Sequence, residues 1–207
     1  MISSAIGVIA MAGAISVFST SVKSNGDNLK RIRLNQELRA IMDVMVRDIR
    51  RAGYWSIADG TTPNPFSTLN VSGDEKCITY RYDFATVPPA VPDPLDNANN
   101  FGFKFHNNGV KYRTNSATCG TNNNWVFISD PNAVKVTSLN FNLTTTCANL
   151  SAKIDTDCIA SSPAADDVLS YMYMLEITLN GELTSDSNVT YSLTDSVSIR
   201  NAVPLVN

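Results

Sequence analysis

The sequence has little of what catalytic and metal sites are built from. His106 is the only histidine, and no two of the four cysteines are spaced as CxxC. Structural zinc sites need closely spaced cysteine or histidine ligands, so this pattern nearly excludes zinc. The sequence also has no GxSxG motif, phosphate loop or dinucleotide fingerprint, which leaves His106 without a nucleophile to activate. We therefore expect a protein that is not an enzyme, with His106 as a solvated side chain beside a hairpin turn.

Positive charge is scarce after residue 55. Residues 1–55 contain eight Lys/Arg and four Asp/Glu, whereas the remaining residues contain eight and fifteen. An acidic domain is a poor surface for nucleic acid, and the basic N-terminal part suits a membrane face or partner helices. Four carboxylates fall between Asp155 and Asp167, but they lack the EF-hand spacing. A solvated acidic loop is the expectation there, with calcium as the weaker alternative, and we expect no other cofactor.

The first charged side chain is Lys23, so the stretch Met1–Val22 is uncharged. A helix of this length reaches across a bilayer, at about 1.5 Å per residue and roughly 30 Å of hydrocarbon. The stretch has no basic n-region or cleavage pattern of a signal peptide. We therefore expect a membrane-emergent stalk that carries an exported head. Its small residues would let another helix approach closely, although a plain membrane anchor fits the sequence too.

A second helical segment carries apolar residues at three- and four-residue steps. The residues of this stripe are Leu34, Leu38, Ile41, Met42, Met45 and Ile49. Because the pattern lasts only about three heptads, we expect it to pack on a sheet of the same chain rather than in a coiled coil. Gly53 fits a helix C-terminus, and the weak helix formers at 24–28 predict a kink or a melted turn.

The apolar period changes to two after residue 54, which predicts strands. The predicted strands are 77–84, 101–106, 110–113, 125–129, 134–143, 169–179 and 189–200, with hairpin turns at 107–109 and 180–181. No helical crossover separates them, so the sheet should be antiparallel and the fold class α+β. The expected domains are a helix over 1–53 and a β-rich head over 54–207. Within the helix, 1–22 is the membrane or filament-core part and 27–53 is the part that packs on the head.

The cysteines predict disulfides in the loops of the head. An even number in an exported domain favours two bonds, among Cys77, Cys119, Cys147 and Cys158. Three pairings are possible. We favour Cys77–Cys119 together with Cys147–Cys158, because the second bond would close a short polar loop.

An apolar helix that becomes amphipathic and leads into such a head resembles a type IV pilin. Residues 38–54, LRAIMDVMVRDIRRAGY, are similar to a segment of the PilW-type minor pilins, which are relatives of the J-type minor pseudopilins of type II secretion. Residues 77–83, 125–130, 139–141 and 198–201 resemble strands of that family's head. The resemblance implies a pilin-like fold and a helix-assembly face made of Ile6, Gly7, Ala10, Gly13, Ala14 and Phe18.

The resemblance also implies a function. Such a chain would be a structural or priming subunit at or near the tip of a type IV pilus. Its helix would start in the bacterial inner membrane, with the head in the periplasm, and would then pack against other minor pilins and the major pilin in an extracellular filament. The inner-membrane assembly platform would be a further partner. Alternatives are a minor pseudopilin of type II secretion, a membrane-anchored adhesin-like binding module and a membrane-anchored periplasmic enzyme.

One departure from the family concerns the start of the helix. Prepilins of this kind carry a basic leader, a cleaved glycine and a Phe-x-x-x-Glu opening, and none of these is found here. Ile6 and Phe18 align beyond that opening. We therefore expect the leader, the cleavage site and the assembly glutamate to precede residue 1, or else a divergent protein that lacks them.

Overall fold

The computed structural model describes residues 2–56, 64–84, 99–115, 118–120, 124–149, 168–199 and 205–206. Within the N-terminal helix, side chains are described at Gly7 and from Met11 onward. At 147–149, 168–170 and 205–206, only the backbone is described.

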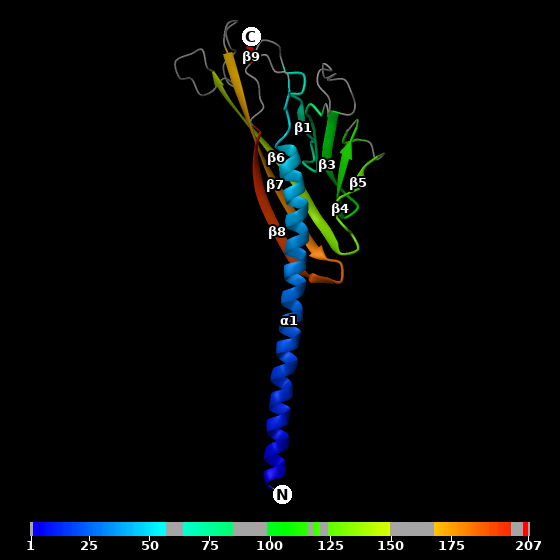
Figure 1. Ribbon diagram of the computed structural model, residues 1–207, viewed down its shortest axis with the longest axis vertical. Coiled ribbons are helices and arrows are strands. Elements are labelled where there is room, and N and C mark those ends of the chain that lie inside the picture. The colour runs from blue at the N-terminus through cyan, green and yellow to red at the C-terminus, as the bar shows by residue number, and fades with distance from the viewer. Residues whose placement is uncertain are drawn as a thin grey trace.

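One long helix, α1 (Ile2–Ile49), projects from a β-rich head (Figure 1). It runs through residues 24–28 without interruption, so the predicted kink there is wrong. Gly26 costs only about 1 kcal/mol relative to alanine, and the next turn gains an ion pair between Lys30 Nζ and Asp27 Oδ1 at 3.6 Å. In the part of the chain that the structure describes, no helix is both long and apolar enough to cross a membrane, so a membrane-spanning Met1–Val22 is not supported.

The end of α1 is joined directly to the head. After Ile49 the chain forms turns that reach Gly53, whose φ of 76° is the left-handed conformation of a helix C-cap. The Gly53 N–H donates to the Arg81 carbonyl at 2.8 Å, and the Gly53 carbonyl accepts from the Asn64 side chain at 2.7 Å. The helix terminus is thereby tied to a strand and to a loop of the head.

The head contains two antiparallel sheets, where a single one was expected. Sheet A has the order β1 (Leu69–Val71), β2 (Cys77–Arg81), β3 (Asn100–His106), β4 (Gly109–Thr114), β5 (Val126–Phe127). Sheet B has the order β6 (Val134–Asn149), β7 (Val168–Leu183), β8 (Asp186–Ile199), and β9 (Leu205–Val206) also pairs with β7. Backbone hydrogen bonds from Phe141 to Glu75 and from Val136 to Asn108 connect the two sheets, at 2.8 and 2.9 Å.

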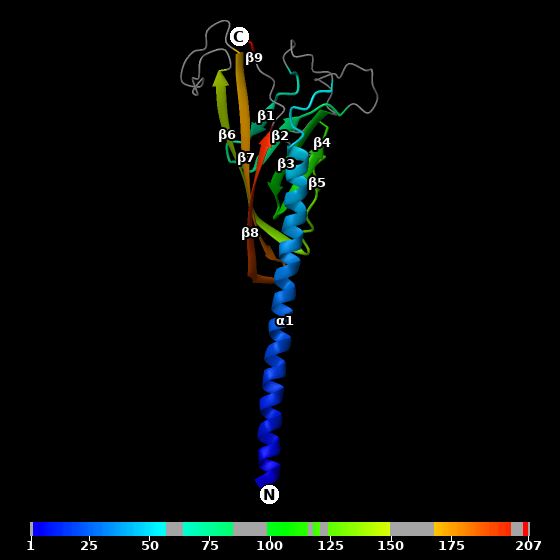
Figure 2. The ribbon, with the colours of Figure 1, turned by 60° about the vertical axis from the view of Figure 1, so that its left-hand side comes forward.

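The core lies where α1 meets both sheets. In Figures 1 and 2, β8 lies on one side of α1 and β4 and β5 lie on the other. Leucine, isoleucine and methionine side chains of α1 share this core with Ile177 and Phe141 of sheet B and with aromatic residues of sheet A, among them Tyr80 and Phe103. The mixed helical and antiparallel architecture confirms the α+β class.

The predicted turn at Asn180–Gly181 is wrong, because β7 continues through both residues to Leu183. Asn180 pairs with Ser192 and Gly181 with Tyr191 of β8. A Cβ on Gly181 would lie 3.0 Å from the Leu38 side chain and 3.3 Å from the Lys135 carbonyl. This glycine therefore permits close approach of α1 and β6 and does not form a turn.

The predicted disulfide between Cys77 and Cys119 is present. It ties β2 to residue 119, which lies between β4 and β5. Cys158, and with it the second predicted disulfide, lies outside the described residues, as does the acidic segment 155–167.

We predict that Gly181→Val lowers the free energy of unfolding by about 1–3 kcal/mol, because the larger side chain would push against Leu38 and the Lys135 carbonyl. Chemical denaturation measures this change. The matched control is Gly73→Val, at a site where an added Cβ meets no atom within 4 Å. Equal losses at the two glycines would contradict the tight contact.

Candidate functional site: an uncovered helix and its junction with the head

The N-terminal part of α1 presents apolar side chains that nothing in the described head covers. Met11, Ile15, Val17, Phe18 and Val22 are between 54% and 71% exposed. A Cβ on Gly7 or Gly13 would meet no atom within 4 Å, so packing within this chain does not require these glycines. An exposed apolar surface of this extent marks an interaction site.

The predicted assembly face lies on this uncovered part of the helix. Gly7, Gly13, Ala14 and Phe18 are exposed. The side chains of Ile6 and Ala10 lie outside the described residues. The apolar surface continues toward the head through Leu29 and Ile32, which are 68% and 52% exposed.

The other predicted stripe lies in the head-covered part of α1. The structure places all six of its residues in the core, each at most 4% exposed: Leu34, Leu38, Ile41, Met42, Met45 and Ile49. The helix therefore passes from uncovered to buried between Ile32 and Leu34.

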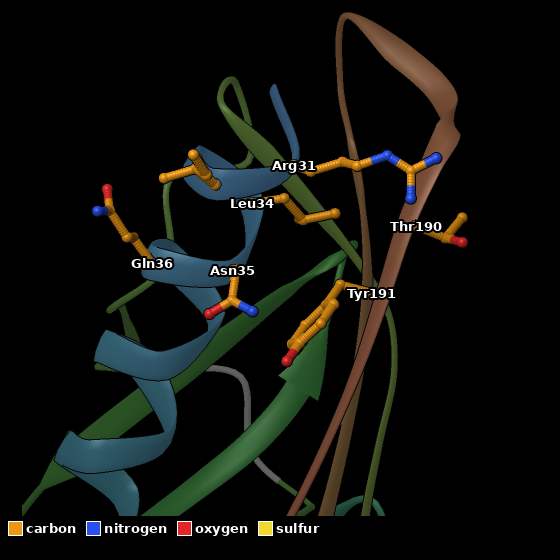
Figure 3. Close-up of a pocket in the computed structure, with 7 residues that line it drawn as sticks. Arg31, Leu34, Asn35, Gln36, Thr190 and Tyr191 are labelled. Atoms are coloured by element: carbon orange, nitrogen blue, oxygen red, sulfur yellow. The ribbon is translucent and has the colours of Figure 1, made fainter. Parts of the chain in front are cut away.

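A groove of about 420 Å³ lies between α1 and β8 at this transition (Figure 3). Leu34 and Tyr191 line it, and Arg31 reaches from the helix toward Thr190 on β8. An ion pair between Lys30 Nζ and Asp186 Oδ2 at 2.9 Å joins the helix to the start of β8. Hydrogen bonding in this pair raises the pKa of Lys30 and lowers the pKa of Asp186.

The junction of α1 with sheet A is built around the carboxylate of Asp48. The Tyr80 hydroxyl donates to Asp48 Oδ2, and the Tyr82 hydroxyl donates to Oδ1 at 3.0 Å. The Arg51 guanidinium lies 3.9 Å from the same Oδ1 and 4.5 Å from the centre of the Tyr82 ring. One carboxylate on the helix thus binds two side chains of β2 and its margin, and Arg51 completes the cluster.

The tyrosines at this junction are held in their neutral form. Burial raises the pKa of Tyr80, of Tyr82 and of Tyr112, and the negative charge of Asp48 raises all three further. Their rings belong to an aromatic layer: Tyr82 stacks on Phe101 at a centroid distance of 3.9 Å. A neutral hydroxyl can donate to the carboxylate, so burial and hydrogen bonding favour the same state.

His106 lies at the end of β3, opposite Gly109 of the hairpin, and is partly exposed. Partial burial lowers its pKa, and Lys111 and Lys104 lower it further. Among the described residues, no group of three or more His, Cys, Asp or Glu side chains is placed to hold a metal ion.

The role of Asp48 was not recognised in the sequence, although the segment that contains it was. Asp48 directly precedes the buried Ile49, and Tyr80 and Tyr82 are two residues apart on the buried face of the strand. Two features of the sequence could have indicated this contact: a carboxylate at the edge of the apolar helical stripe, and tyrosines on the buried face of a strand, whose hydroxyls need a hydrogen-bond partner.

A helix that is buried in an antiparallel head at one end and uncovered at the other is consistent with a pilin-like protein. A family model, prepilin peptidase-dependent protein B, matches residues 27–199. The chain belongs to this family, which relates it to the proteins of type IV pili and pseudopili. No curated protein and no solved structure matches the chain.

We predict that Asp48→Ala lowers the free energy of unfolding by about 3 kcal/mol, because it leaves two tyrosine hydroxyls without their charged acceptor. Thermal or chemical denaturation measures the loss. Asp43→Ala, at an exposed position on the same helix, is the matched control and should change stability by less than about 0.5 kcal/mol. Similar losses in both variants would contradict a structural role for Asp48.

Alkaline pH should destabilise the protein through these tyrosines. In the unfolded chain a tyrosine ionises near pH 10, whereas in the folded chain the pKa of Tyr80, Tyr82 and Tyr112 is raised. Their contribution to stability is therefore complete below about pH 10 and is lost as the pH rises above it. Phenolate absorbance should show three of the seven tyrosines ionising only as the chain unfolds. Their ionisation before unfolding would contradict the junction.

Proposed function

We propose that this chain is a minor pilin of the PilW type, a structural and priming subunit at or near the tip of a type IV pilus. The observation that carries the proposal is the unbroken helix α1, whose apolar stripe is buried from Leu34 to Ile49 and which bears uncovered apolar side chains between Met11 and Ile32. Helices of neighbouring subunits can bury the same apolar surface, and glycines and alanines let them approach closely.

In this proposal, α1 packs against other minor pilins and the major pilin, and assembly begins at a platform on the bacterial inner membrane. The head faces the periplasm first and the cell exterior afterwards. The Cys77–Cys119 disulfide supports this route, because disulfides persist in oxidising compartments. The family description, prepilin peptidase-dependent, supports entry into the pilus pathway.

The work done by such a subunit is mechanical, and we propose no catalytic role. A pull on α1 reaches the head through the packing stripe, the Asp48 hydrogen bonds and the Gly53–Arg81 backbone bond. These contacts lie at the head end of the helix, so they leave the uncovered part available for partners.

The second candidate is a minor pseudopilin of type II secretion, because the family match extends to pseudopili. The same helix would then serve a short periplasmic pseudopilus. Neighbouring genes distinguish the two candidates: a retraction ATPase and pilin genes favour the pilus, whereas a secretin with secretion components favours the pseudopilus.

We predict that deleting the gene strongly reduces surface pili and that Phe18→Asp fails to restore them. Phe18 is 71% exposed, so the variant should keep its melting temperature and lose only helix packing between subunits. The matched control is Val44→Asp, since Val44 is 48% exposed on the head-covered part of the same helix. The measurement is the amount of pilus sheared from complemented cells. Full restoration by Phe18→Asp, or normal piliation after deletion, would contradict the proposal.

A further inference from the structure

The strand β8 lies at one edge of sheet B. Within the described residues, β8 pairs with β7 on one side and with no strand on the other. An edge strand presents a row of unpaired N–H and C=O groups, with which another extended chain can form hydrogen bonds. Whether β8 accepts such a chain depends on which of these backbone groups are already bonded.

Aspartate side chains protect both ends of this edge. The Asn188 N–H donates to the Asp186 carboxylate at 3.3 Å, and the Ser196 N–H donates to the Asp195 carboxylate at 2.7 Å. The second bond indicates that the Ser196 N–H is directed away from β7, because a side chain of its own strand satisfies it. Charges at a strand edge are a common protection against unwanted strand pairing.

The middle of the edge has no such protection. Backbone groups alternate in direction along an antiparallel strand, so Thr190, Ser192 and Thr194 direct their N–H and C=O groups the same way as Ser196 does. All three residues are exposed and uncharged, and in the described part of the chain they form no backbone hydrogen bond outside the β7–β8 ladder. The stretch from the first to the last is about 14 Å long, which is enough for a short added strand.

A groove lies beside this stretch, on the side of the helix. It is the groove of about 420 Å³ between α1 and β8. Its lining includes Thr190 and Tyr191 of β8 and Arg31, Ile32, Asn35 and Gln36 of α1 (Figure 3). Successive side chains of a strand point to opposite faces of the sheet, so every second side chain of a strand added to β8 would face α1 and enter this groove.

The groove is basic. Arg31 reaches from α1 toward Thr190 (Figure 3) and forms no ion pair with any described residue. The neighbouring Lys30, by contrast, pairs with Asp186 at 2.9 Å. Among the described residues that line the groove, none is an aspartate or a glutamate. Carboxylates at alternate positions of an added strand would supply the missing counter-ion, whereas lysines there would be repelled.

We propose that the middle of the β8 edge and the groove beside it, together called the β8 slot below, bind an extended acidic segment of another protein. The segment adds to sheet B as an antiparallel strand opposite Thr190, Ser192 and Thr194. Backbone hydrogen bonds supply affinity that does not depend on sequence, and carboxylates that face Arg31 supply selectivity. Ile32, which is 52% exposed, adds an apolar contact.

A second copy of this chain is a poorer occupant of the β8 slot. The helix α1 runs alongside β8 in both views (Figures 1 and 2). Antiparallel pairing of two β8 strands would therefore direct the two helices in opposite directions. Subunits whose helices start in one membrane cannot pair in this way, so the slot suits a segment of a different protein.

The binding test uses the full chain in a nonionic detergent at low salt. The probe is the synthetic peptide acetyl-Thr-Glu-Thr-Glu-Thr-Glu-Thr-amide, whose glutamates face the groove when its threonines lie on the outer face of the sheet. Isothermal titration calorimetry should give a dissociation constant below about 1 mM, and the absence of binding at that concentration would overturn the proposal. The same peptide with lysine in place of each glutamate should bind at least about tenfold more weakly.

Methylation of peptide amides tests the backbone pairing. In an antiparallel strand opposite Thr190, Ser192 and Thr194, the threonine N–H groups of the probe donate to β8 and its glutamate N–H groups point away. Methylating the threonine amides should abolish binding, whereas methylating the glutamate amides should change the dissociation constant by less than about threefold. The reverse result, or binding that survives both modifications, would contradict strand addition.

Ser192→Pro tests the edge from the side of the protein. Proline is tolerated in an edge strand where its nitrogen faces away from the sheet, so the variant should fold and lose the central donor of the slot. It should bind the glutamate probe at least about tenfold more weakly than the wild type. The matched control is Ser192→Ala, which keeps the N–H and should bind like the wild type. Equal binding by the two variants would argue against backbone pairing.

Arg31→Glu tests the charge of the groove and does not depend on the proline variant. It should weaken binding of the glutamate probe at least about tenfold and strengthen binding of the lysine probe. The matched control is Arg33→Glu, because Arg33 is exposed on the same helix and does not line the groove. Equal losses in the two variants would show that the groove does not select the probe.

Sedimentation velocity without peptide tests the alternative occupant. The chain should show no self-association that depends on the β8 edge. Self-association that Ser192→Pro abolishes would mean that a second copy occupies the slot, and the proposal would be wrong. None of these measurements involves piliation, so failure of the β8 slot and failure of the pilus role are separate results.

Discussion

The rest of the structure depends on how the helix is fixed to the head, and the carboxylate of Asp48 is central to that attachment. It lies one residue before the end of α1 and accepts hydrogen bonds from Tyr80 and Tyr82. The strand that carries these tyrosines, β2, makes two further bonds: the Arg81 carbonyl accepts a hydrogen bond from the Gly53 N–H, and Cys77 forms a disulfide with Cys119. Three kinds of bond thus hold one strand to the helix terminus, to the helix side and to a distant loop. Such a junction lets a force on the helix move the head as one body.

The length of sheet B decides where the helix becomes uncovered. Leu29 and Ile32 are apolar and yet 68% and 52% exposed, so apolar character in the helix does not by itself mark the boundary. The hairpin of β7 and β8 turns at 184–185, and Lys30 pairs there with Asp186. Beyond that point no strand of the described residues covers the helix. Had β7 turned at Asn180–Gly181, residues near Leu38 would have lost part of their cover, and the uncovered surface would have begun later in the helix.

The sequence predicts the elements of this fold better than it predicts their arrangement. The three- and four-residue spacing of the Leu34–Ile49 stripe identifies the buried helical face, because burial repeats with the helix period. Strand alternation likewise identifies Ile78 and Tyr80 as inward-facing. Alternation does not say which strands pair, so the division into two sheets was not predicted. The Asn180–Gly181 pair was predicted to be a turn because glycine is common in turns. Glycine also occurs where two segments approach closely, and here only the position of Leu38 shows that Gly181 has this second role. Asp48 was not recognised because its partners are more than thirty residues away.

The total charge of the head likewise does not predict how the charges are distributed in the folded protein. A total over residues is a sum, and it assigns one acidic character to a domain whose two sheets differ in sign. Folding separates the charges, since β3 and β4 bring Lys104 and Lys111 into register while the carboxylates of β7 and β8 collect on the other sheet. Opposed charges across a sheet stabilise the chain when they pair within it. Two of the four carboxylates in the strands of sheet B pair within the chain, Glu182 with Lys135 of the same sheet and Asp186 with Lys30 of α1, so the folded arrangement and not the total charge decides which charges are compensated.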